Sequence, residues 1–80
     1  MAWGLSYQTP VRMIDVTPSD TVNLATAGIL YIGTAGDIKI LTSGGDTQTI
    51  TIATDGTFFP VVCARVFATD TTATNVKVCY

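Results

Sequence analysis

Threonine and other β-branched residues dominate this chain and restrict its fold more than any other feature. Fifteen of the 80 residues are threonine, and valine and isoleucine recur between them. Two heavy atoms on Cβ stiffen these side chains and favour strands over helices. Glutamate is absent and only two lysines occur, so strong helix formers are few. The chain is therefore predicted to be all-β.

Apolar and polar residues alternate in short runs that are separated by Gly, Asp, Thr and Pro, which indicates about seven short strands. They are expected within residues 11–16, 22–24, 29–32, 38–40, 47–53, 58–68 and 76–80. Residues 29–32 are almost wholly apolar, as in a strand buried on both faces. The pattern predicts a single-domain antiparallel β-sandwich or barrel over residues 11–80.

The long run at residues 61–68 predicts one face made of Val62, Ala64 and Val66 and an opposite face made of Val61, Cys63, Arg65 and Phe67. Residues 1–10 form a predicted N-terminal arm, in which Trp3, Leu5 and Tyr7 alternate with small or polar residues. Two alternatives stay open for this arm: it adds a strand to another surface, or it packs on its own domain.

Charge is sparse. The net charge is −2, and charged residues make up 12% of the chain, about half the usual share for a soluble domain. Such a composition suits a protein that covers much of its surface with neighbouring subunits. The four basic residues form no cluster, so we expect no nucleic-acid binding. No apolar stretch approaches a membrane span and no signal peptide is apparent, so synthesis in a host cytoplasm is expected.

No catalytic, cofactor-binding or metal-binding residues are predicted, and the chain is not expected to be an enzyme. Histidine, the commonest general base and a frequent metal ligand, is absent. Asp37, Asp46 and Asp55 recur at nine-residue intervals beside glycines. Calcium ligands usually converge on one compact loop, whereas these three acids lie in separate predicted turns. We therefore expect them to bond to backbone N–H groups.

The only two cysteines, Cys63 and Cys79, are candidates for a disulfide because both are predicted on strand faces that also carry a basic residue. Such a bond would contribute about 3 kcal/mol. The alternative is two reduced thiols that act as small buried hydrophobes, as expected for a product of the cytoplasm.

Candidate interface residues are Trp3, Leu5, Tyr7, Arg65 and Tyr80. Aromatic and arginine side chains dominate contact energies at protein interfaces. Arg65 interrupts an apolar run, which indicates either an ion pair between subunits or a side chain that reaches solvent. Phe58 and Phe59 are further candidates, for which core filling is the alternative.

Four segments, in their order and spacing, resemble one family. They are residues 16–21 (VTPSDT), 30–38 (LYIGTAGDI), 60–62 (PVV) and 66–73 (VFATDTTA). The chain resembles the small head spike base proteins of tailed bacteriophages and gene transfer agents over residues 16–80. The two cysteines, and Thr54-Asp55 and Phe58-Phe59, depart from the family pattern.

The resemblance implies a structural virion protein on the capsid surface, either a spike base or a decoration (cement) subunit. The implied partners are other copies of the chain, in a trimer or pentamer, the major capsid protein and a head fibre protein. A tail or baseplate component is the alternative within virions. A carbohydrate-binding β module is the alternative from another class.

Overall fold

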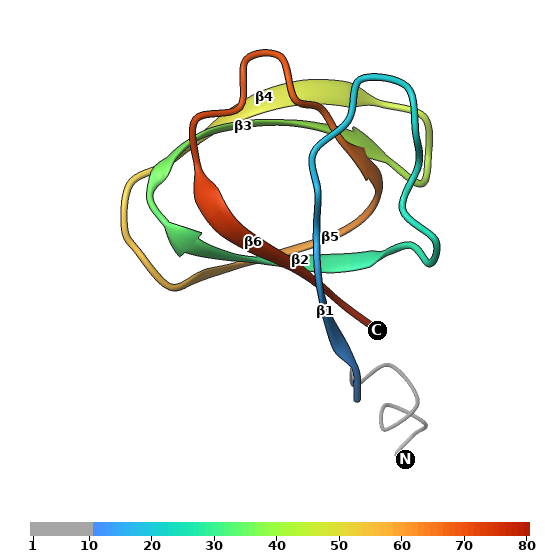
Figure 1. The fold of residues 1–80 in the computed structure, drawn as a ribbon, viewed down its shortest axis with the longest axis horizontal. Coiled ribbons are helices and arrows are strands. Elements are labelled where there is room, and N and C mark those ends of the chain that lie inside the picture. Colours follow the sequence, from blue (N-terminus) through green and yellow to red (C-terminus); the bar gives the residue numbers. More distant parts are fainter. Residues whose placement is uncertain (1–10) are drawn as a thin grey trace.

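The computed structural model describes residues 11–80, which form one antiparallel β-sheet without helices. Its strands are β1 (Met13–Asp15), β2 (Gly28–Thr34), β3 (Gly36–Thr42), β4 (Thr47–Ile52), β5 (Thr57–Val66) and β6 (Thr74–Cys79), in the spatial order β1-β6-β2-β5-β3-β4. The sheet curls around a common interior, with β3 and β4 facing β2 and β6 across it (Figure 1). The predicted all-β class is confirmed. In this part of the chain no helix is long and apolar enough to cross a membrane.

The interior is filled by alternate residues of the strands. Leu30 and Ile32 of β2 meet Ile38 and Ile40 of β3, and all four side chains are fully buried. Completing this core are Ile52, Cys63, Val66, Ala73, Val76 and Val78. Burial of each large aliphatic side chain contributes about 1.5–3 kcal/mol, so the period-two pattern of the sequence is what selects the inward face.

The predicted burial of residues 29–32 on both faces is wrong. Leu30 and Ile32 point inward, whereas Ile29 and Tyr31 lie on the outer face of the sheet and are only half-buried. An antiparallel sheet of this size covers one face only, and an apolar run therefore leaves half of its side chains outside.

The two predicted faces of residues 61–68 are also wrong. Cys63 and Val66 are both buried although they are three residues apart. The pairing of β5 with β3 shifts register between Leu41 and Thr42, and its pairing with β2 shifts between Gly28 and Leu30. Extra residues bulge out of the β5 ladder there and break the period of two.

Residues 11–80 form six strands rather than about seven, because the strand expected at residues 22–24 is absent. Ser19 Oγ instead accepts hydrogen bonds from the backbone N–H groups of Thr21 (3.3 Å) and Val22 (3.1 Å). Such local bonds compete with a sheet ladder. Residues 16–27, called the irregular segment here, connect β1 to β2 without a strand. Ser19 N donates a hydrogen bond to Val66 O and Leu24 N donates one to Ala64 O, each 2.8 Å, and these bonds hold the segment against β5.

Candidate interaction surface

An apolar surface covers the outside of the sheet where β1, β6 and β2 lie side by side. Met13 of β1 is paired with Cys79 of β6, which is paired in turn with Ile29 of β2. These residues line a groove of about 350 Å³ together with Val11, Arg12 and Phe58. We call the apolar members Val11, Met13, Ile29, Phe58 and Cys79 the outer patch. Cross-strand pairing places side chains of one row on one face, so the patch follows directly from strand register.

Large side chains of the outer patch are exposed. The exposed fraction is 86% for Val11, 55% for Phe58 and 49% for Met13. The Phe58 ring packs against Tyr31 with ring centroids 5.0 Å apart and planes tilted by 58°. The next row of the same face carries the ion pair between Lys77 and Asp15. An apolar centre bordered by charged groups is typical of a protein-protein contact surface.

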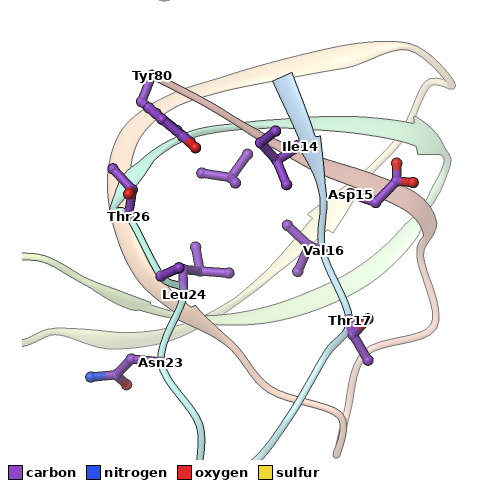
Figure 2. Close-up of a pocket in the computed structure, with 10 residues that line it drawn as sticks. Ile14, Asp15, Val16, Thr17, Asn23, Leu24, Thr26 and Tyr80 are labelled. Carbon is purple, nitrogen blue, oxygen red and sulfur yellow. The ribbon is translucent and has the colours of Figure 1, made fainter. Parts of the chain in front are cut away.

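A second hollow opens between β1 and residues 23–26. It has a volume of about 200 Å³. Figure 2 shows Ile14, Val16 and Leu24 pointing into the hollow, whereas Asp15 and Asn23 point away from it. The Tyr80 hydroxyl is directed toward the hollow beside these three aliphatic side chains, so the hollow offers mainly apolar packing.

The predicted interface residue Arg65 makes contacts within its own chain. Its Nε donates a hydrogen bond to Asn23 Oδ1 (2.8 Å), and its Nη1 donates to the backbone oxygen of Asp20 (3.2 Å). The guanidinium lies 5.3 Å from the centre of the Phe67 ring, within cation-π range. Arg65 therefore ties the irregular segment to β5.

The other predicted interface residues differ in their placement. Tyr80 is partly exposed, lies at the rim of the second hollow and exchanges backbone hydrogen bonds with Arg12. Trp3, Leu5 and Tyr7 lie outside the described residues, as does the predicted arm at residues 1–10.

Cys63 and Cys79 are not cross-strand neighbours, because β2 lies between their strands. Both thiols are free and buried. Burial raises the pKa of Cys63 to about 11 and raises that of Cys79 as well. The Cys63 thiol donates a hydrogen bond to Val61 O at 3.3 Å. A thiol with a raised pKa is a poor nucleophile, so neither cysteine resembles a catalytic one.

Of the three aspartates expected to bond to backbone N–H groups, only Asp55 does so within the part of the chain that the structure describes. Asp55 Oδ1 accepts a hydrogen bond from Ala35 N (2.6 Å), and Asp37 Oδ1 accepts one from Thr51 Oγ1 (2.9 Å). Within residues 11–80, no three His, Cys, Asp or Glu side chains gather closely enough to hold a metal ion.

The outer patch was not predicted from the sequence as a unit. Of its members, only Phe58 was an interface candidate, with core filling as the alternative. The signal was present in residues 29–32, since a fully apolar run in an antiparallel sheet must place side chains on an outer face.

Comparison with solved structures finds a chain from a structure described as the capsid of a native gene transfer agent (GTA) particle computed with C5 symmetry. The two chains are 36% identical and superpose with a TM-score of 0.79. The match covers 89% of this chain and 83% of that chain. No protein-family model and no curated protein matches this sequence.

Proposed function

This chain belongs to the same family as the matched chain of the gene transfer agent capsid, and we propose that it is a non-enzymatic head protein of a phage-like particle. In this proposal it docks on the capsid surface as a spike base or decoration subunit. Its partners are other copies of itself and the major capsid protein, and a head fibre protein is a further candidate.

One observation carries the proposal: the likeness to the capsid chain extends over nearly all of both chains, at a sequence identity well above that of unrelated proteins that share a fold. The segments that resemble spike base proteins lie within the same domain. Fold alone would not assign a function, but sequence identity and fold together support a shared role in a particle.

The outer patch supplies the physical means of docking. Its exposed aliphatic and aromatic side chains release ordered water when a second surface covers them. Soluble monomers rarely leave such a patch open. The sparse charge of the chain also favours docking through apolar contacts. Attachment of this kind should depend little on salt.

Self-association in a closed ring is the arrangement we propose for the copies. Closed cyclic symmetry is the general rule for protein oligomers. A trimer and a pentamer both suit the local symmetry axes of a head.

The test is a binding experiment with heads that lack this protein. Particles are produced from a genome with the gene deleted, purified, mixed with the purified chain and sedimented. We expect the chain to sediment with the heads and to reach a fixed saturating copy number. Binding only to isolated tails would instead support a tail or baseplate role, and binding to neither would contradict the proposal.

A further inference from the structure

The two edge strands of the sheet differ in how well they are protected against pairing with a further strand. β1 is an edge of three residues that includes Asp15, and Pro18 follows shortly after it. β4 is the other edge, spans six residues (TQTITI) and contains neither a charge nor a proline. Proteins usually protect an exposed edge with charges, prolines, bulges or short length. β4 has none of these devices, and within residues 11–80 no strand pairs with its outer side, so backbone groups there are unpaired.

β4 also has one side that is incompletely covered. Ile52 is buried, and Ile50 packs against the core but is only partly buried. Gln48 shares their side, because the three residues pair with Gly36, Ile38 and Ile40 of β3. Thr47, Thr49 and Thr51 lie on the opposite, exposed side. A strand added beside β4 with apolar side chains at alternate positions would continue the core past Ile50.

The N-terminal arm has the matching pattern. Trp3, Leu5 and Tyr7 alternate with Gly4, Ser6 and Gln8, and this six-residue stretch carries no charge. Alternation of this kind is typical of a strand with one buried face. The stretch is as long as β4, and its three apolar positions correspond to the three inward positions of that strand.

We propose that residues 3–8 of one copy add as an antiparallel strand to β4 of a neighbouring copy, which rests on the homo-oligomer of the proposed function. Trp3 then lies opposite Ile52, Leu5 opposite Ile50 and Tyr7 opposite Gln48. On the outer side, Ser6 lies opposite Thr49. Antiparallel pairing matches the rest of the sheet and is the more stable arrangement per residue.

The position where the arm begins favours pairing with β4 of a neighbouring copy over pairing with β4 of the same chain. Val11 is fixed at the β1 edge by a backbone hydrogen bond to Tyr80 O (2.8 Å). Figure 1 shows β1 running toward the side of the sheet that carries β4, so the chain before β1 starts from the far side. Pro10 favours an extended conformation at Thr9, which opposes an immediate reversal. Ten extended residues span about 33 Å, and the domain measures 41 × 26 × 20 Å, so the arm is long enough to leave its own domain and reach an adjacent copy.

Cross-linking between two differently tagged copies tests the proposal. The Ser6→Cys and Thr49→Cys variants of the full chain are co-expressed, purified together, oxidised mildly and separated on a denaturing gel. We expect a reducible product that contains both tags. The control pairs Ser6→Cys with Thr21→Cys, because Thr21 is exposed but lies outside β4. The control should give little mixed product.

Light scattering on the same samples distinguishes failure of strand exchange from failure of the homo-oligomer itself. An oligomer that gives no more Ser6-Thr49 product than the control overturns strand exchange and leaves the homo-oligomer standing. A monomer overturns both. A chain that carries both cysteines and forms only an internal cross-link also overturns exchange between copies, because its arm then pairs with its own β4.

A fluorescence measurement gives a second readout without new cysteines. Trp3 is the single tryptophan of the chain. Its emission should shift to the blue as the oligomer forms, and Thr49→Pro should reverse this shift because proline disrupts the edge. Unchanged emission on oligomerisation would contradict burial of Trp3 beside Ile52.

Discussion

At the scale of single residues, Asp20 holds the irregular segment to the turn after β5. Its carboxylate accepts hydrogen bonds from Thr69 Oγ1 (2.6 Å), Thr69 N (2.9 Å) and Ala68 N (3.0 Å). The side-chain bond from Thr69, followed by the backbone bonds, lowers the pKa of Asp20 below its ordinary value of 3.8. Because the folded pKa is depressed, the stabilisation is complete well above pH 3.8 and is lost as pH falls through the folded pKa.

Asp20→Asn should therefore lower the melting temperature at pH 7, with a smaller difference from the unaltered chain below pH 3.8. Asparagine keeps one acceptor but lacks the charge that strengthens these bonds. Thermal unfolding followed by circular dichroism from pH 2 to 7 measures the difference. Asp46→Asn is the control, since the Asp46 carboxylate accepts no hydrogen bond within residues 11–80. An equal difference at all pH values would contradict the account.

The thiols of Cys63 and Cys79 should react slowly in the folded chain. Both are buried, and burial raises the pKa of each, so little thiolate is present at neutral pH. Titration with a thiol reagent should find two thiols per chain in denaturant without reductant and a much slower reaction in native buffer. Finding no thiol in denaturant would instead establish the disulfide considered from the sequence.

At the scale of the strands, the close contact between β2 and β6 depends on Gly28. A Cβ at this position would lie 2.1 Å from the backbone oxygen of Cys79. Gly28→Ala should separate the two strands and destabilise the fold by about 1–3 kcal/mol, as overpacking generally does. Gly44→Ala is the matched control, because its Cβ would meet nothing closer than Thr42 Oγ1 at 3.8 Å.

Urea unfolding measures both glycine variants. We expect a clear fall in the midpoint for Gly28→Ala and a change within about 0.5 kcal/mol for Gly44→Ala. Equal effects of the two substitutions would show that the contact between Gly28 and Cys79 does not limit the approach of β2 and β6.

The inward face of a strand was predictable where two conditions held. Apolar and polar residues alternated strictly along the strand, and the strand paired with its neighbours in regular register. β3 and β4 met both conditions, and Ile38, Ile40 and Ile52 are inward as expected. β5 failed the second condition, since its bulges depend on the spacing of β2 and β3 on either side of it. The sequence of residues 61–68 alone therefore does not predict where β5 bulges.

The expected strand at residues 22–24 failed for a different reason. Val22 and Leu24 alternate with Asn23 as in a strand, yet Ser19 and Asp20 draw the backbone into local and turn contacts. The bond from Arg65 to Asn23 then fixes the segment against β5. The contacts of Asp20 with Thr69 and of Asn23 with Arg65 join residues more than 40 positions apart, so only the folded chain reveals them.

At the scale of the whole molecule, the outer patch should govern attachment to the head. Phe58→Ser and Met13→Ser should each weaken binding to heads while leaving the melting temperature nearly unchanged, because both side chains are about half-exposed. Val22→Ser is the control, since Val22 is 66% exposed and lies outside the groove. Sedimentation with heads measures binding, and equal binding by all three variants would contradict docking through the patch.

Salt dependence gives an independent check on the same surface. Apolar docking should persist or strengthen when sodium chloride is raised to about 1 M, where exposed charges interact only over about 3 Å. A steep loss of binding with salt would instead indicate attachment through the few charged groups.

The interaction surface was less predictable than the fold. Low charge in the sequence already indicated a chain that is covered by neighbours. The location of the patch required strand order, because Met13, Cys79 and Ile29 come together only when β6 lies between β1 and β2. Of the aromatic and arginine anchors expected from the sequence, Arg65 proves to hold its own chain together.

The central claim is attachment to the head of a phage-like particle. Cryo-electron microscopy of intact particles that carry this chain tests it most directly. The account predicts density for the six-stranded domain on the outer capsid surface at a symmetry axis, with the outer patch against the major capsid protein. Density for the domain only in the tail, with none on the head, would contradict it.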